Sequence, residues 1–360
     1  MAKTVTFVAK IFLMKHFLLP LFFAPFLFQC SAQTPVRQIR LDGKHIVLLL
    51  DSDAAGAAIT TDRYDRYFDL VQPSEMSIQM RKPLVEGQSR AEWVAAYKTF
   101  LKEDVEGFDY QESKFVEEVM ERVFKTCESV APGLFPDTLR LMKTKGRHYG
   151  DGVWYTREKD IIIPANELES RKTSPFTTTV FHEVFHVISR LQPVKSAELY
   201  RLIGFEGIGL EQLKLPSELA QRVLYNPDGV DFAQKISLST DGGVIQAVPI
   251  IFSKEVGHQP GQDEFFSYVE FNLFQITPNG DGSWQVVTKE DGFSSTLSMD
   301  KLPDFFRQIK DNTGYIIHPD EVLADNFSFI MSSRKNPAMT AKFSKEGKQL
   351  LVDMENILKK

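Results

Sequence analysis

The chain has 360 residues, of which 43% are hydrophobic and 25% are charged, and its formal net charge is −6 at pH 7. These proportions are typical of a globular protein with a substantial core, and they argue against a disordered chain. Charges of both signs are mixed along the sequence, so no basic face is predicted on which a nucleic-acid backbone would bind. We therefore expect no nucleic-acid partner.

The N-terminal segment 1–32 has the organisation of a secretory signal peptide. Lysines precede the apolar run "FLLPLFFAPFLF", and the small residue Ala32 precedes the expected cleavage point. The run has twelve residues, which span about 18 Å as a helix, against a bilayer core of roughly 30 Å. We expect an exported protein, periplasmic or secreted, without a stable membrane span. Lipid anchoring through Cys30 is the alternative.

Residues 33–192 are expected to form the first part of the fold. A strand is predicted at 44–50, and helical spacing of apolar residues covers much of 62–130. The runs "VWYT" and "DIIIP", joined by the polar turn "REKD", predict a hairpin. The second of these runs is interpreted either as an edge strand that pairs with an extended substrate or as an internal buried strand.

The stretch "SPFTTTVFHEVFHVISRLQP" predicts a single helix, with Ser174 as the N-cap, Pro175 as the first helical residue and Pro193 after its end. Residues 193–360 should form the second part of the fold, with a β-rich insertion at about 228–298 and helices within 318–333 and 344–360. The "NPDG" turn, residues 226–229, could line a cleft, but turn formation fully explains its composition. The predicted fold class is α+β.

Two histidines lie four residues apart on the predicted helix. His182 and His186 therefore share a face and can direct two imidazoles at one metal ion, while Glu183 lies on the neighbouring side. This is the H-E-x-x-H pattern, in which zinc lowers the pKa of a bound water and the glutamate accepts its proton. We predict that the histidines are zinc ligands and that Glu183 is the general base of peptide-bond hydrolysis.

A catalytic zinc needs a third protein ligand, and two glutamates are candidates. Glu206 lies twenty residues after His186, but in the poorly helical stretch "IGFEGIG". Glu321 lies in "YIIHPDEVLADNF", where Asp325 follows four residues later on the same helix face. Glu321 would bind zinc, and Asp325 would accept the second ring N–H of His182 and so fix its tautomer. We prefer Glu321.

The combination of "HEVFH" with a distant "EVLAD" resembles the gluzincin family of zinc metallopeptidases. The chain is also similar to little-characterised exported bacterial proteins that combine such a site with a helix of this type. The resemblance covers two short helices, which a longer segment separates here. It implies one zinc ion, a zincin-like fold with the H-E-x-x-H helix packed against a small β-sheet and a helical C-terminal part, and endopeptidase activity on a peptide or protein substrate.

The resemblance also implies a tyrosine or histidine that stabilises the oxyanion. Tyr315 and His318, directly before the Glu321 helix, are the nearest candidates. The alternative function is a non-catalytic peptide- or ligand-binding protein on the same scaffold.

Overall fold

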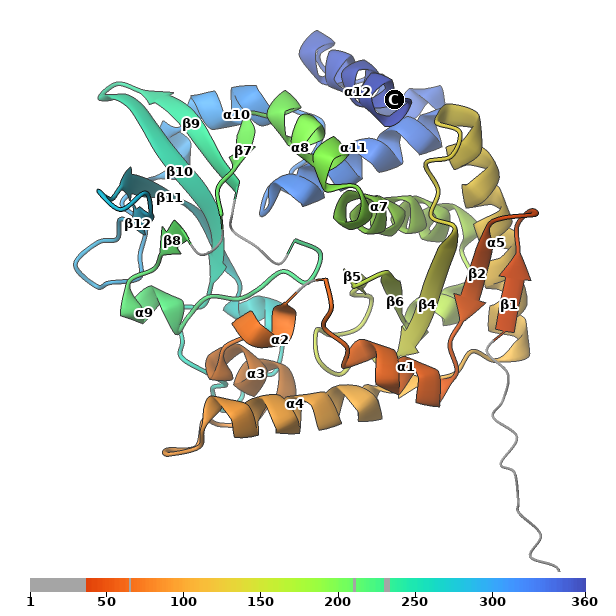
Figure 1. Cartoon of the computed structure of the whole chain (residues 1–360), viewed down its shortest axis with the longest axis horizontal. Helices are drawn as coiled ribbons and strands as arrows, with labels where there is room; N and C mark the ends of the chain where they lie inside the picture. Colours follow the sequence, from red (N-terminus) through yellow and green to blue (C-terminus); the bar gives the residue numbers. More distant parts are fainter. Residues whose placement is uncertain (1–36, 65, 210–211, 230–233) are drawn as a thin grey trace, which may run out of the picture. The chain divides into compact units, whose positions relative to one another are not determined.

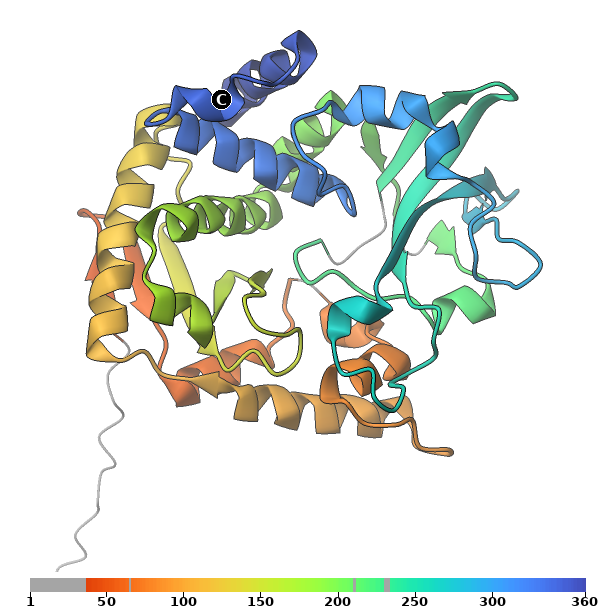
Figure 2. The same ribbon diagram turned by 180° about the vertical axis from the view of Figure 1, so that it is seen from behind.

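The computed structural model describes residues 37–64, 66–209, 212–229 and 234–360. The predicted signal peptide, with Cys30, lies outside the described residues. The described part contains helices and two six-stranded sheets, which confirms the α+β class. The two sheets lie on opposite sides of this part of the chain, as the front and back views both show (Figures 1 and 2).

The first sheet consists of β1 (Arg37–Arg40), β2 (Ile46–Leu49), β3 (Val105–Glu106), β4 (Thr138–Thr144), β5 (Tyr155–Arg157) and β6 (Asp160–Pro164). The strand order is β1-β2-β4-β6-β5, with β3 paired to β4 off this path. β5 and β6 form the predicted antiparallel hairpin. Ile161 and Ile163 of β6 pack into one core and Ile162 packs into another. β6 is therefore an internal strand buried on both faces, and it offers no edge to a substrate.

The second sheet consists of β7 (Phe205–Gly207), β8 (Leu213–Lys214), β9 (Gln234–Thr240), β10 (Gly243–Phe252), β11 (Glu270–Pro278) and β12 (Trp284–Val286). Its order is β7-β9-β10-β11-β12-β8, antiparallel except for the β12–β8 pair. β9 to β12 lie within the predicted β-rich insertion, whereas β7 and β8 precede it and form the two edges. The strands of the insertion thus pair at each edge with a strand that precedes the insertion, β9 with β7 and β12 with β8.

The described α-helices are α1 (Ser52–Ile59), α2 (Tyr67–Leu70), α3 (Pro73–Met80), α4 (Arg90–Asp104), α5 (Tyr110–Val130), α6 (Ala165–Ser170), α7 (Thr173–Leu191), α8 (Pro193–Leu202), α9 (Ser217–Ala220), α10 (Pro303–Ile309), α11 (Pro319–Ser333) and α12 (Lys345–Leu358). Short 3-10 helices are η2 (Phe265–Tyr268), η3 (Met299–Lys301) and η4 (Pro337–Thr340). The predictions of Ser174 as the N-cap and of Pro175 as the first helical residue were wrong, because α7 begins at Thr173 with Lys172 at the cap position. Pro175 permits this early start, since N–H groups of the first turn have no partner within the helix.

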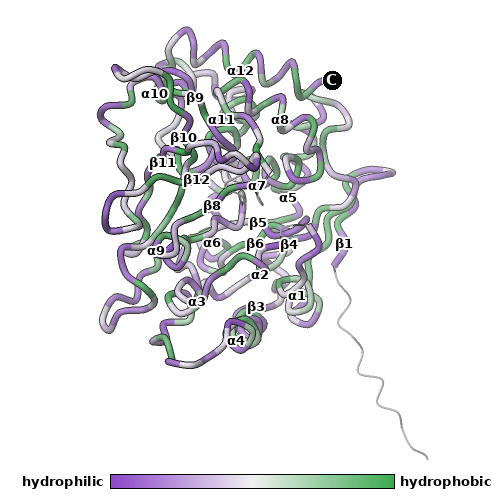
Figure 3. Tube along the Cα trace, turned by 60° about the vertical axis from the view of Figure 1, so that its left-hand side comes forward, coloured by the Kyte–Doolittle hydropathy of each residue, from purple (hydrophilic) through white to green (hydrophobic). Residues whose placement is uncertain are grey.

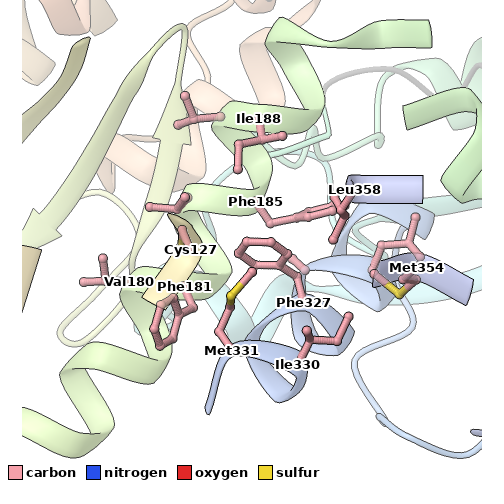
Figure 4. Packing of buried hydrophobic residues seen from close by; sticks show 14 of the residues in the cluster. Cys127, Val180, Phe181, Phe185, Ile188, Phe327, Ile330, Met331, Met354 and Leu358 are labelled. Atoms are coloured by element: carbon pink, nitrogen blue, oxygen red, sulfur yellow. The ribbon is translucent and has the colours of Figure 1, made fainter. Parts of the chain in front are cut away.

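The main core fixes α7 in place. Phe181 and Phe185 of α7 are at most 3% exposed, and α7 packs against β5, β6 and α11. The ring of Phe185 lies 5.5 Å from that of Phe327 on α11, with Met354 and Leu358 of α12 close by (Figure 4). The helix therefore lies against the first sheet, and both predicted parts of the chain contribute to this core.

The terminal helix α12 is amphipathic. Hydrophilic and hydrophobic residues alternate along it (Figure 3), and Leu350, Met354 and Leu358 belong to the core. Among the described helices, none combines the length and the apolar character that crossing a bilayer requires.

Candidate metal centre

Two packed helices bring the predicted ligands together. His182 and His186 lie one turn apart on α7, and Glu321 lies in the first turn of α11. One ligand atom of each lies within 4.8 Å of the other two. Glu321 Oε2 is 3.0 Å from His182 Nε2 and 3.4 Å from His186 Nε2. The three side chains therefore converge on one point.

This donor set fits a zinc ion. Two imidazole nitrogens and one carboxylate oxygen are typical ligands of catalytic zinc. His186 is fully buried, and its Nε2 makes no hydrogen bond in the described part of the chain, although Glu321 Oε2 lies 3.4 Å away. A buried polar atom without a partner is rare because it is costly. Zinc coordination by the three side chains would satisfy it.

Two aspartates of α11 lie against the other ring nitrogens. Asp325 Oδ1 is 2.9 Å from His182 Nδ1, the contact that we predicted for this residue. Asp320 Oδ2 is 2.7 Å from His186 Nδ1, a contact that we did not predict. Neighbouring residues on a helix point about 100° apart. Asp320 therefore contacts Nδ1 of the His186 ring while Glu321 lies near Nε2 of the same ring. Carboxylates in these positions orient each ring and raise its basicity as a ligand.

Asp320 is itself held by hydrogen bonds. The hydroxyls of Ser189 and Tyr200 donate to its Oδ1 at 2.6 and 2.7 Å. Burial alone would raise the pKa of Asp320, but the hydrogen bonds from His186, Ser189 and Tyr200 lower it below its ordinary value. The carboxylate behind His186 is therefore ionised. The signal that we overlooked is its position directly before Glu321 in the first turn of the helix.

Glu183 lies beside the ligands and lines an open cleft. Glu183 shares the lining of this cleft with His182, Tyr315, Glu321 and Asp325. Glu183 is only 3% exposed, and its Oε2 has no hydrogen-bond partner within the described residues. Burial, together with the neighbouring Asp228, raises the pKa of Glu183. A carboxylate with a raised pKa is suited to general base catalysis near neutral pH.

The "NPDG" turn takes part in the site, and our interpretation of it as a turn alone was incomplete. Asn226 Nδ2 donates a hydrogen bond to Glu321 Oε1. Asp228 forms a second group with Glu183 and His186, in which one ligand atom of each lies within 4.8 Å of the others. The turn thus orients Glu321, the predicted third ligand, and adds a carboxylate beside the predicted base.

The turn is fastened to both α7 and β5. Arg190, one helical turn after the last histidine, donates to the carbonyl oxygens of Pro227 at 3.1 Å and Asp228 at 3.3 Å. The N–H and the hydroxyl of Thr156 donate to Asp228 Oδ1 at 2.5 and 2.7 Å. No spacing rule connects this turn with α7, because only the tertiary fold brings the two together.

The two candidate oxyanion-stabilising residues are placed differently. Tyr315 lines the cleft, is 41% exposed, and stacks on His182 with 6.1 Å between the ring centroids. His318 is the N-cap of α11, where its Nδ1 accepts the N–H of Asp320, and it is not among the described residues that line the cleft. The geometry favours Tyr315.

Glu206, the alternative third ligand, lies away from the histidines. It is an exposed residue of β7 and forms an ion pair of 3.1 Å with Lys235. Within the described residues, the group that contains both histidines includes Glu321 and not Glu206. The geometry therefore agrees with the preference for Glu321.

Comparisons of the chain with models of known protein families, with curated proteins and with solved structures give no match.

Proposed function

We propose that this chain is an exported zinc-dependent metallopeptidase. The observation that carries the proposal is the convergence of His182, His186 and Glu321, with Glu183 beside them in an open cleft. The first three residues would hold one zinc ion, which supplies a Lewis acid for the substrate carbonyl and lowers the pKa of water. The signal-peptide organisation of residues 1–32 supports export.

In this proposal Glu183 transfers the proton. Its carboxylate takes a proton from the attacking water as the water oxygen bonds to the carbonyl carbon. It then delivers that proton to the amide nitrogen as the carbon–nitrogen bond breaks. Tyr315 donates a hydrogen bond to the oxyanion of the tetrahedral intermediate.

Three further residues keep the ligands in position during this reaction. Asp325 and Asp320 hold the imidazoles of His182 and His186, and Asn226 holds the carboxylate of Glu321. These residues and the predicted ligands lie on α7, α11 and the "NPDG" turn, which are packed together. The ligand positions are therefore set before a substrate binds.

Elemental analysis of the purified protein, paired with hydrolysis of a broad peptide library, tests the proposal. We expect one zinc ion per chain and hydrolysis that a chelator abolishes. Glu183→Gln should keep the zinc and lower hydrolysis by about 10²- to 10⁴-fold, whereas the exposed Glu206→Gln should change neither. Unchanged hydrolysis in Glu183→Gln would contradict the mechanism. A metal-free protein that binds peptides without cleaving them would support the binding-protein alternative.

A further inference from the structure

We infer that an apolar pocket beside the cleft binds one side chain of the substrate next to the cleaved bond, and that this side chain is aromatic or large and aliphatic. The inference rests on the proposed function and assigns its substrate class. The aromatic pocket, as we call it, has walls that include Tyr149, Leu224, Ile251, Phe265 and Val269. Its lining is mostly apolar and aromatic, as is usual for ligand pockets.

The aromatic pocket adjoins the cleft. The residues that line both are Val153, Trp154, Asp228, Phe266 and Tyr315. Asp228 belongs to the group with Glu183 and His186, and Tyr315 stacks on His182. A peptide bond that lies at Glu183 therefore has one of its flanking side chains within reach of the pocket.

The walls of the pocket select for apolar side chains. Leu224, Ile251 and Phe265 are each at most 9% exposed and present hydrocarbon to the cavity. Transfer of an aromatic or branched aliphatic side chain from water to such a surface is favourable. Alanine would leave most of the pocket unfilled.

Acidic side chains are selected against. The described lining residues include no lysine or arginine. Their one acidic residue is Asp228, which also lines the cleft. A substrate carboxylate would lose water without gaining a cationic partner. The expected order of preference is therefore phenylalanine or leucine, then alanine, then aspartate.

Two exposed aromatic rings mark the mouth of the pocket. Phe266 is 56% exposed and Tyr315 is 41% exposed, and apolar surface exposed at the rim of a cavity is typical of a binding site. Phe266 lies on η2, between β10 and β11, and not on the helices that carry the ligands. Substitutions on this side of the pocket can therefore change selectivity without removing a metal ligand.

A binding experiment tests the pocket without relying on hydrolysis. The probes are blocked pentapeptides with phenylalanine, alanine or aspartate at the centre and alanine elsewhere, titrated against zinc-loaded Glu183→Gln protein. Trp154 lines the pocket mouth and provides a fluorescence signal. We expect the phenylalanine peptide to bind at least about 10-fold more tightly than the alanine peptide, and the aspartate peptide to bind most weakly. Equal affinities, or no saturable binding, would overturn the inference.

Hydrolysis of the same peptides by the wild-type protein separates the two proposals. Cleavage with an at least ~10-fold higher kcat/KM for phenylalanine than for alanine supports both of them. Cleavage without this preference overturns only the assignment of the pocket. Selective binding without cleavage contradicts the proposed hydrolysis and leaves the aromatic pocket as a recognition site.

A variant that fills the pocket provides the matched test. Val269→Trp should lower the affinity for the phenylalanine peptide to that for the alanine peptide while the zinc content stays the same. Val244→Trp is the control, because Val244 is 70% exposed on β10 and is not a lining residue of the pocket. If Val269→Trp does not fold, Phe266→Ala should reduce the preference, with the exposed Phe306→Ala as its control. An unchanged preference in the folded pocket variant overturns the inference.

Discussion

The helix pair α7 and α11 and the segments beside it, which include the "NPDG" turn, β10 and η2, contribute to the cleft and its aromatic pocket in different ways. The helices supply His182, His186 and Glu321, whose relative positions follow from helical spacing and from one packed contact between the helices. The turn supplies Asn226. The walls of the aromatic pocket come from several segments that only the tertiary fold brings together, among them Tyr149 between β4 and β5, Ile251 of β10 and Phe265 of η2. In our proposals the rigid helix pair carries metal binding, whereas selectivity depends on segments that only the tertiary fold brings together.

Substitution of Glu321, the proposed third ligand, should have the largest effect on zinc affinity. A small effect would contradict the assignment of metal binding to the helix pair. Glu321→Ala should lower zinc affinity by more than ~100-fold, since even residues that only support a ligand contribute about 10- to 100-fold. Competition with a chromophoric chelator measures the affinity. Glu206→Ala is the matched control and should bind zinc like the wild-type protein. The opposite pair of results would transfer the ligand role to Glu206 and away from the helix pair.

The aspartates behind the histidines should have the next largest effect. Asp320→Asn and Asp325→Asn should each lower zinc affinity by about 10- to 100-fold. The loss should be greater for Asp320, because it is 2% exposed and accepts hydrogen bonds from Ser189 and Tyr200 as well. The same chelator competition, with circular dichroism as a folding control, checks this order. A folded Asp320→Asn protein with wild-type zinc affinity would show that the charge of this carboxylate does not contribute to zinc binding.

The pH dependence of stability probes the region next to the "NPDG" turn. Glu75 is fully buried and accepts the N–H of Tyr225, next to the turn, at 3.0 Å. Burial raises its pKa from 4.5 to about 8. The folded protein therefore keeps a proton that the unfolded chain has released, so this contribution to stability is complete below pH 4.5 and is lost as the pH rises to about 8.

Glu75→Gln should remove that dependence. In the wild-type protein the free energy of unfolding should fall by about 1.4 kcal/mol per pH unit from this residue alone, and urea unfolding at several pH values measures the slope. The exposed Glu86→Gln should leave the slope as it is. An equal slope in Glu75→Gln and wild type would show that Glu75 does not hold its proton in the folded state.

Loss of the hydrogen bond from Asn226 to Glu321 should have the smallest effect on zinc affinity. This variant measures how much the turn contributes to metal binding compared with the helix pair. Asn226→Ala should weaken zinc binding by roughly fivefold, because a typical hydrogen bond contributes about 1 kcal/mol. Asn279→Ala, in the turn between β11 and β12, is the matched control and should leave zinc affinity unchanged. A loss as large as that of Glu321→Ala would show that the turn belongs to the metal centre as fully as the helices do.

The local features of this fold could be predicted from the sequence. The apolar spacing of α7 and α12 and the polar turn between β5 and β6 are short-range patterns, and each predicts an element that the structure contains. The choice of Glu321 over Glu206 also followed from a local pattern, since only Glu321 has a carboxylate four residues later on its helix.

The features that depend on long-range contacts could not be predicted in this way. β7 and β8 are short strands that find their partners far along the chain, so their own residues carry little strand signal. Asn226 and Asp228 have the composition of any tight turn. Their place beside Glu321 and Glu183 depends on Arg190 and Thr156, which hold the turn to α7 and β5.

The most direct test of the metal centre is anomalous diffraction at the zinc absorption edge from crystals of the protein purified with zinc. We predict one anomalous peak per chain, bounded by the Nε2 atoms of His182 and His186 and by the carboxylate of Glu321. The absence of a peak at that point, or a peak beside Glu206 instead, would contradict the proposed centre.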